Sequence, residues 1–290
     1  MRLHGLIVPL ITPFTKSGEL NFDALENTMS FIEDYIDGIL ICGTFGSGPL
    51  MHVDERMKVA EYILDRIKNR IKTIVHVGST DTLTSIKLAK HAEDIGADVV
   101  MSLPPYYYKH REVEVLHHYR ELISSVNIPV YAYNNPKTVG YEITPELLSK
   151  LVELGISGIK DSSFDIFTFM NYMIKCGDKI DLIMGTEALM LPAYSLGCRV
   201  FIAGMLNYFP ELVRELYNEL ESSNYDRARE IQYKIVKVRN IVYKYPPIIA
   251  THAILKLKGI NSGYPKPPYK PLTDDEIEYL RRELSQYGVI

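Results

Sequence analysis

A lysine that follows a short apolar run is the residue of this chain with the clearest chemical potential. Lys160 lies in the segment 156–161, which reads as a buried strand followed by a helical stretch. A lysine at the end of such a strand is partly removed from water, and desolvation favours the neutral, nucleophilic amine. The chemistry that this predicts is Schiff-base formation with a carbonyl substrate. A strand-end lysine can equally reach solvent or pair with Asp161, so the rest of the chain has to decide.

Side chains that can move protons or bind an anion follow three other apolar runs. Tyr133 ends one run, Thr44 lies on the glycine-rich turn 43–48, and Tyr107 belongs to the tyrosine triplet 106–108. A Schiff-base enzyme must transfer protons, which a tyrosine within hydrogen-bond reach can do. Glycines around Thr44 allow backbone N–H groups to approach a carboxylate. Packing or a tight turn explains each feature alone, but their joint occurrence favours a catalytic site.

The elements that must position these residues alternate regularly between strands and helices. Eight apolar runs, bounded by Gly or Pro, are typical of strands buried on both faces. They are residues 6–11, 38–42, 73–77, 99–103, 129–133, 156–159, 182–184 and 200–203. Helical patterns lie between them at residues 54–67, 83–95, 112–124, 145–154 and 188–196. The alternation predicts an α/β fold, a (β/α)₈ TIM barrel with reactive side chains at the carboxyl ends of its strands. An open doubly wound sheet is the alternative, but its glycine-rich phosphate loop is missing after the first run.

The last part of the chain predicts a helical extension rather than a second barrel half. Helical patterns cover residues 210–220, 225–242, 248–256 and 274–284, with a proline-rich loop at 263–268. We therefore expect a barrel over residues 1–206 and a C-terminal helical appendage over 207–290 that packs on it.

Composition excludes several other classes of protein. The chain has 290 residues, 47% hydrophobic residues and a net charge of -4, with no basic stripe, so we expect no nucleic-acid partner. Apolar stretches are interrupted before about 18 residues, which predicts no membrane span, and the N-terminus reads as a first strand rather than a signal peptide. Three unclustered cysteines, Cys42, Cys176 and Cys198, favour a reducing cytoplasm and predict no metal site.

Four motifs together carry a family resemblance. They are Gly-Thr-x-Gly at 43–46, Pro-Tyr-Tyr at 105–107, Tyr-Asn-x-Pro at 133–136 and Gly-x-Lys-Asp at 158–161. Their order and spacing resemble those of the pyruvate-dependent class I aldolases of the dihydrodipicolinate synthase and N-acetylneuraminate lyase superfamily. The likeness runs from Thr12-Pro13-Phe14 through the barrel to the C-terminal helices.

The resemblance implies roles for individual residues. Lys160 would form the Schiff base, Tyr133 would shuttle protons, and Thr44 would be its hydrogen-bonded relay. Tyr107 would complete the relay of a neighbouring subunit, in a homotetramer built as a dimer of dimers. No metal or organic cofactor is implied. The residues expected to line the substrate pocket are Gly43, Phe45, Gly46, Thr138, Ser162, Gly185, Ile202 and Ala203.

Two positions depart from the pattern of dihydrodipicolinate synthases. Thr138 stands where their arginine grips the carboxylate of aspartate semialdehyde, and the adjacent Lys137 does not reproduce a bidentate guanidinium. Phe45 replaces the second of two adjacent hydroxyl residues, which helps to hold the pyruvate carboxylate. The loop 43–49, the tyrosine triplet and the tail 263–268 are instead similar to archaeal-type 2-keto-3-deoxygluconate aldolases.

The expected activity is reversible cleavage of a 2-keto-3-deoxy sugar acid to pyruvate and an aldehyde such as glyceraldehyde. A phosphorylated sugar acid is an alternative, because Lys109, His110 and Arg111 follow the tyrosine triplet and could meet a phosphate. Dihydrodipicolinate synthase and N-acetylneuraminate lyase are alternatives with the same mechanism. A catalytically weakened barrel that binds a keto acid is the alternative of another class, and Phe45 is the residue that supports it.

Overall fold

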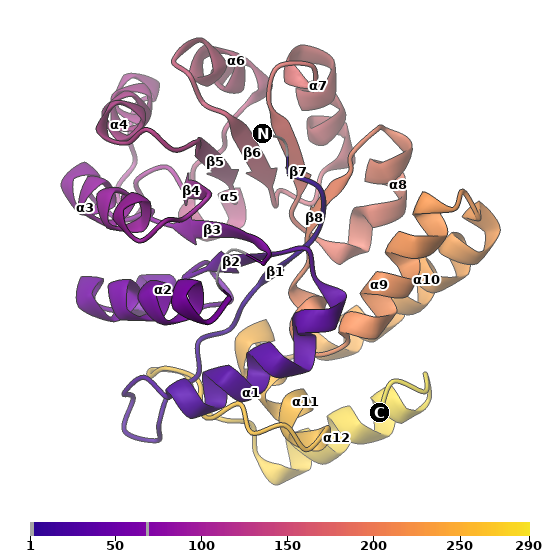
Figure 1. Cartoon of the computed structure of the whole chain (residues 1–290). Helices are drawn as coiled ribbons and strands as arrows, with labels where there is room; N and C mark the ends of the chain where they lie inside the picture. Colours follow the sequence, from indigo (N-terminus) through magenta and orange to yellow (C-terminus); the bar gives the residue numbers. More distant parts are fainter. Residues whose placement is uncertain (1–2, 68–69) are drawn as a thin grey trace.

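Eight short runs of aliphatic and β-branched residues form parallel strands that pair in sequence order and close into a barrel (Figure 1). The computed structural model describes residues 3–67 and 70–290. The strands are β1 Gly5–Pro9, β2 Gly38–Ile41, β3 Lys72–His76, β4 Val99–Ser102, β5 Val130–Asn134, β6 Gly158–Asp161, β7 Asp181–Met184 and β8 Val200–Ile202. The expected TIM barrel is confirmed.

Helices surround the barrel and extend it at the C-terminus. The α-helices are α1 Phe22–Ile32, α2 Val53–Ile67, α3 Thr82–Asp94, α4 Glu112–Ser125, α5 Pro136–Val139, α6 Pro145–Glu153, α7 Ile166–Cys176, α8 Met190–Ser195, α9 Pro210–Glu221, α10 Tyr225–Val242, α11 Pro247–Leu257 and α12 Asp274–Ser285. Short 3₁₀ turns are η1 Glu33–Tyr35, η2 Gly48–Leu50, η3 Glu187–Leu189 and η4 Gly204–Asn207. Helix α6 begins with a capping residue followed by a proline: the Thr144 hydroxyl accepts a hydrogen bond from the Leu147 N–H at 3.2 Å, with Pro145 in the first turn.

Two boundaries differ from the expectation in ways that affect the site. Strand β6 runs two residues further than the apolar run, because the backbone ladder continues through Lys160 and Asp161. Ladder pairing uses only main-chain groups, so polar side chains at a strand end do not stop it. The expected helix at 188–196 divides into η3 and α8, since the Thr186 hydroxyl caps a 3₁₀ turn at the Ala188 N–H.

The barrel has an inner core that is separate from the layer between strands and helices. Inward-facing side chains from alternate strand positions fill the interior, as in other barrels of this type. This inner cluster consists of Leu3, Ile7, Leu40, Ile74, Val99, Met101, Leu103, Tyr131, Tyr133, Ile183, Val200 and Ile202. Tyr133 therefore belongs to the inner core and also lies near the carboxyl end of its strand, β5.

Gly158 makes room for the ring of Tyr131 at the barrel centre. The two residues face each other across β5 and β6, and a Cβ on Gly158 would lie 2.5 Å from a ring carbon of Tyr131. The ring is fixed, because its hydroxyl donates to the Asp181 carboxylate, which also accepts the Leu3 N–H at 3.0 Å.

We expect Gly158→Ala to lower the free energy of unfolding by about 1–3 kcal/mol, because overpacking forces backbone shifts in a filled core. Urea unfolding of this variant measures the effect. The matched control is Ser157→Ala, at the residue directly before β6. The control should change by less than about 0.5 kcal/mol. Equal stability of both variants would show that the strand can shift without cost.

The C-terminal helices pack on the barrel rather than standing apart from it. Helix α9 contacts β1, and Nζ of Lys258, at the end of α11, lies 5.0 Å from the ring centre of Phe31 in α1. The Asn207 side chain bridges the chain after β1, accepting from the Ile11 N–H and donating to the Pro9 carbonyl, each at 3.0 Å. A bridge between Phe14 and Tyr264 joins the proline-rich loop to the same region. The division into residues 1–206 and 207–290 stays a prediction.

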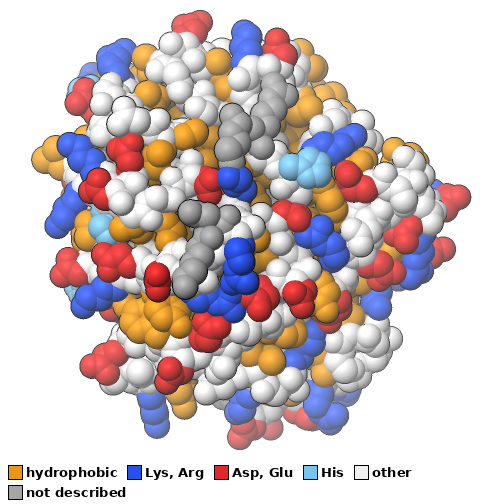
Figure 2. Space-filling view, viewed as in Figure 1, with side chains coloured by type: hydrophobic (Ala, Val, Ile, Leu, Met, Phe, Trp, Pro, Cys, Tyr) orange, Lys and Arg blue, Asp and Glu red, His pale blue; other side chains and the backbone are white. Residues whose placement is uncertain are grey.

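The described surface carries charges of both signs. Acidic and basic side chains are interspersed over the face that Figure 2 shows. Within residues 3–67 and 70–290, no helix has the length and apolar character needed to cross a membrane.

Candidate active site

Lys160 and Tyr133 meet at the carboxyl ends of two neighbouring strands. They are register partners across β5 and β6. The Lys160 side chain is buried, with the residue only 4% exposed, and its Nζ lies 4.1 Å from the centre of the Tyr133 ring. Within residues 3–67 and 70–290, Lys160 forms no ion pair with a carboxylate, and a buried amine of this kind is a candidate for chemistry. The pairing that the sequence predicted is present.

The Tyr133 hydroxyl lies in a small hydrogen-bond network. It is 3.3 Å from the Thr44 hydroxyl and accepts a hydrogen bond from the Asn135 side-chain amide at 3.2 Å. Burial opposes ionisation of this phenol, but the charge of Lys160 and hydrogen bonds from Thr44, Lys160 and Ser162 outweigh it. The pKa of Tyr133 therefore lies below its usual value. A phenol with a lowered pKa is suited to accept and return a proton.

The glycines of the turn after β2 are required by close backbone approaches. A Cβ on Gly48 would lie 1.9 Å from the Cys42 carbonyl oxygen, and one on Gly46 would lie 2.8 Å from the Leu10 carbonyl oxygen. Cys42 and Ser47 adopt positive φ values of 56° and 57° at the two ends of the turn. This tight path brings Thr44 to Tyr133 from a strand three positions away.

Phe45 points from the same turn toward the end of β8. A Cβ on Gly204 would lie 2.4 Å from its ring, so the ring packs on the η4 backbone. Ile202 and Ala203, just before η4, are fully buried, Ile202 in the inner cluster and Ala203 in the layer beneath the helices. Phe45 thus joins the β2 turn to the β8 end.

Ser162 and Gly185 complete the wall around the lysine. The Ser162 hydroxyl donates to the Gly185 carbonyl at 3.3 Å. A Cβ on Gly185 would lie 2.2 Å from that hydroxyl oxygen and 3.0 Å from Cε of Lys160. Glycine at position 185 therefore leaves room for the Lys160 side chain in the conformation observed.

Two of the expected site residues are exposed, unlike the buried residues of this cluster. Thr138 is exposed on α5, the short helix that follows β5. Tyr107 is 84% exposed with φ of 85°, and its ring stacks edge-on against Tyr108 at 5.0 Å between centroids. Among the described residues, no hydrogen bond joins Tyr107 to the Tyr133 hydroxyl.

His76 is an inner residue that the sequence did not single out. It is buried at the end of β3, and its ring meets the Tyr133 ring edge-on at 6.0 Å between centroids. Burial, followed by the charges of Arg56 and Lys160, holds the pKa of His76 well below its usual value. Arg56 donates to the backbone carbonyls of His76 at 2.5 Å and Gly78 at 3.0 Å. The neutral imidazole therefore forms part of the support for Tyr133.

Asp161 faces the helix layer, on the opposite side of β6 from Lys160. Its carboxylate accepts hydrogen bonds from the Asn134 amide at 2.8 Å and from the Ser163 hydroxyl at 2.8 Å. Burial outweighs these donors and raises the pKa of Asp161 to about 6. The side-chain oxygen Oδ1 of Asn134 also accepts the Ile143 N–H at 3.0 Å, so this network ties β5 and β6 to the chain before α6.

The raised pKa of Asp161 predicts a pH-dependent stability. The folded state holds the proton more tightly than the unfolded state, so the contribution is complete below about pH 4 and is lost as pH rises through about 6. Asp161→Asn has the same shape without the titration. We expect the free energy of unfolding of the wild type, minus that of the variant, to fall by on the order of 2 kcal/mol across this range. Urea unfolding of both proteins between pH 4 and 7 tests it, and a constant difference contradicts the assignment.

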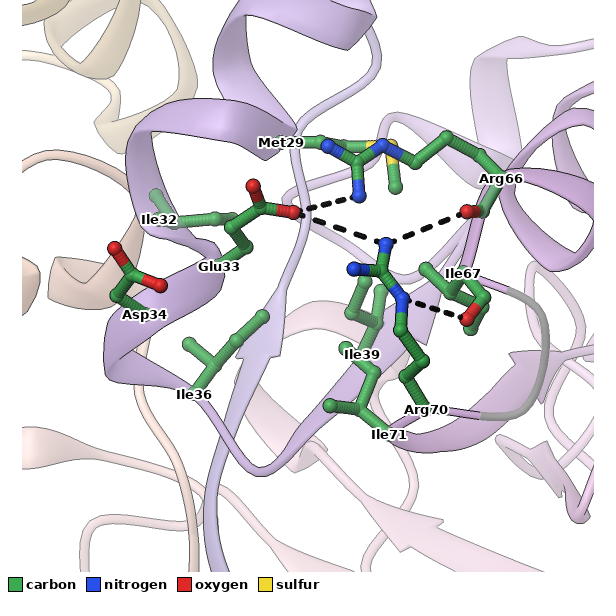
Figure 3. Close-up of a pocket in the computed structure, with 10 residues that line it drawn as sticks. All are labelled: Met29, Ile32, Glu33, Asp34, Ile36, Ile39, Arg66, Ile67, Arg70 and Ile71. Carbon is green, nitrogen blue, oxygen red and sulfur yellow. Dashed lines mark hydrogen bonds and ion pairs between the residues drawn. The ribbon is translucent and has the colours of Figure 1, made fainter.

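The pocket in Figure 3 lies at the other end of the barrel from Lys160. Its lining includes Ile39 of β2 and Ile71, which precedes β3, together with apolar residues of α1 and charged residues of η1 and α2. Glu33 accepts from Arg66 at 2.6 Å and lies 3.9 Å from Arg70. In TIM barrels, residues at the amino ends of the strands usually contribute to stability, whereas catalytic residues lie at the carboxyl ends.

The comparisons agree with the geometry of the strand ends. Residues 2–287 match the model of the dihydrodipicolinate synthetase family. The 4-hydroxy-tetrahydrodipicolinate synthase of Methanopyrus kandleri is 31% identical over 293 residues, covering 100% of this chain and 98% of that protein.

Solved structures extend the likeness to relatives with other names. The structure of KD(P)GA from T. tenax has a TM-score of 0.91 and 27% identity, over 99% of both chains. That of CdNal from Clostridium difficile, in complex with mannosamine, has a TM-score of 0.93 and 25% identity, over 99% of this chain and all of the other. The chain therefore belongs to the dihydrodipicolinate synthetase family, the class I pyruvate-dependent lyases and synthases that act through a lysine Schiff base.

Proposed function

We propose that this enzyme reversibly cleaves 2-keto-3-deoxygluconate, or a closely similar 2-keto-3-deoxy sugar acid, to pyruvate and glyceraldehyde. The observation that carries the proposal is Thr138, which stands where dihydrodipicolinate synthases use an arginine for their second substrate. The buried Ser162 hydroxyl beside Lys160 supports a polyhydroxy substrate, because hydroxyl groups pair with neutral donors and acceptors. The likeness to KD(P)GA supports it further.

The mechanism assigns one role to each of the clustered residues. The Lys160 amine, once deprotonated, attacks the C2 carbonyl. Tyr133 then gives its phenolic proton to the carbinolamine hydroxyl, which leaves as water, so that a protonated imine and the Tyr133 phenolate remain. Tyr133, as phenolate, takes the proton of the C4 hydroxyl while the C3–C4 bond breaks. The bonding electrons pass to C3 and the imine nitrogen, which leaves an enamine and releases the aldehyde. Protonation at C3 and addition of water then release pyruvate and regenerate the lysine.

An unphosphorylated substrate fits the described contacts better than a phosphorylated one. Arg111 is bonded to Glu114 in the capping box of its own helix, with Nη2 and the carboxylate 2.6 Å apart. His110 lies 3.9 Å from the same carboxylate. Arg111 and His110 are thus directed to α4, and a phosphate bound by them would have to displace Glu114.

Two measurements together test the proposal. Borohydride reduction with pyruvate should add an N-(1-carboxyethyl) group at Lys160, which peptide mass spectrometry locates. A panel of aldehydes condensed with pyruvate should then favour D-glyceraldehyde over aspartate semialdehyde and N-acetylmannosamine. Preference for either of the latter contradicts the proposed substrate class. Trapping without turnover of any aldehyde supports a keto-acid-binding barrel instead.

We also propose that Tyr107 acts in a neighbouring subunit of a homotetramer. Tyr107→Phe should then lower kcat about 10–100-fold while pyruvate trapping is kept. Oligomers mixed from this variant and an inactive Lys160→Met variant contain some sites with both residues intact. Their activity should exceed that of either parent. No recovery, although native mass spectrometry shows that subunits have exchanged, would place Tyr107 outside the relay.

A further inference from the structure

A buried ion pair joins the C-terminal extension to the loop after β7. Glu187 lies two residues after Gly185, and its side chain is only 2% exposed. Its carboxylate accepts a hydrogen bond from Nε of Arg239 at 3.1 Å, and the Arg239 side chain, from α10, is 15% exposed. Charges at this depth interact more strongly than surface pairs, and each would be costly to leave alone.

Helix α10 holds this loop by a second contact. The Gln232 side-chain amide donates to the Glu187 carbonyl at 3.0 Å and accepts from the Leu191 N–H at 3.0 Å. Two residues of α10 therefore hold Glu187: Gln232 bonds its main-chain carbonyl, and Arg239 bonds its carboxylate. The loop that borders Lys160 through Gly185 depends on the extension for its position.

The pair lies at the rim that carries the candidate site. The Arg239 guanidinium stacks on the Tyr243 ring at 3.7 Å and lies 4.9 Å from the Phe164 ring centre. Phe164 belongs to the loop after β6, two residues beyond Ser162. Burial, followed by the charge of Glu187, raises the pKa of Tyr243, and Tyr133 contributes to the same shift. The cluster is thus within electrostatic reach of the catalytic tyrosine.

The charge balance of this rim depends on Glu187. A free guanidinium is a strong bidentate ligand for phosphate, but here the Glu187 carboxylate engages its Nε–H and offsets its charge. Lys137 also lies at this rim, with Nζ 5.1 Å from the Phe164 ring centre. It is exposed on α5, where water and salt screen its charge.

We propose that Glu187 is a specificity-determining residue that masks Arg239 and so selects aldehydes with an uncharged terminus. The inference rests on the proposed function and names its substrate class: D-glyceraldehyde is accepted and glyceraldehyde 3-phosphate is discriminated against. Removing the carboxylate converts the rim into a phosphate-binding wall. The determinant lies in the β7–α8 loop and the C-terminal extension, away from the motifs that identify the family.

The test compares the two aldehydes in condensation with pyruvate, using Glu187→Gln, which keeps the shape of the side chain. Wild type should prefer glyceraldehyde by at least about tenfold in kcat/KM, and Glu187→Gln should shift this ratio toward the phosphate by at least about tenfold. The shift should disappear in Glu187→Gln/Arg239→Met. It should persist in the matched control Glu187→Gln/Lys137→Gln.

Three outcomes would overturn the inference. The first is a preference of the wild type for the phosphorylated aldehyde. This result would overturn the inference even if the Glu187→Gln variant does not fold. The others are an unchanged ratio in folded Glu187→Gln and a shift that survives loss of Arg239. Borohydride trapping of pyruvate in each variant separates these failures from failure of the proposed function. Trapping without condensation of either aldehyde overturns both proposals, whereas condensation with an unchanged ratio overturns only this one.

Discussion

Replacing Lys160 by methionine is expected to lower the cleavage rate by at least about 10⁴-fold, because the covalent route is lost. Methionine has nearly the same length and fills the same buried space without an amine. The Tyr133 ring, which now lies 4.1 Å from Nζ, keeps a neighbour of similar shape. Cleavage of 2-keto-3-deoxygluconate, followed by coupled detection of pyruvate, measures the loss, and borohydride with pyruvate should add no mass.

The stability of the same variant separates a chemical loss from an unfolding effect. Lys160 is buried, and replacing a buried charged group by an apolar one of similar volume is commonly neutral or stabilising. We therefore expect Lys160→Met to unfold at the same temperature as the wild type or higher. Lys160→Arg is the matched control, since it keeps the charge but cannot form the imine. Turnover that persists in both variants, or trapping at another lysine, would assign the Schiff base elsewhere.

The barrel and its central pair were predictable because they depend on local patterns. Eight apolar runs fixed the strand order, and adjacent parallel strands bring their carboxyl ends together. Tyr133 and Lys160 end consecutive strands, so their proximity followed from the fold. Thr44 needed more, since its hydrogen bond to Tyr133 depends on the course of a turn, but the glycines of that turn were visible in the sequence.

Contacts made by residues with no pattern of their own could not be predicted. Asn135 donates to the Tyr133 hydroxyl, although in the sequence it reads only as a turn residue before a proline. His76 ends an ordinary β-strand pattern, and nothing local shows that its ring meets Tyr133.

The extension presents the same difficulty at longer range. Arg239 is 52 positions from Glu187 in the sequence. The periodic pattern of its helix predicts that α10 forms, but not where α10 packs on the barrel. Such pairings are set by how helices pack around the barrel, which a single sequence does not encode as a readable signal. The helix was therefore predictable, whereas its approach to the active site was not.

Removing only the hydroxyl of Tyr133 is expected to separate proton transfer from imine formation. Tyr133→Phe keeps the ring that Lys160 and His76 contact, so the packing of the site is preserved. We expect kcat for cleavage to fall by about 10²–10⁴-fold, the usual contribution of a positioned acid–base group. Pyruvate should still be trapped on Lys160, because the amine and its surroundings remain.

Thr44→Val, which leaves the phenol and the Asn135 donor in place, should lower kcat less than Tyr133→Phe does. If Tyr133→Phe keeps kcat within about tenfold, another group carries the proton. If Thr44→Val costs as much as Tyr133→Phe, the threonine hydroxyl is an obligatory member of the relay rather than a support for the phenolate.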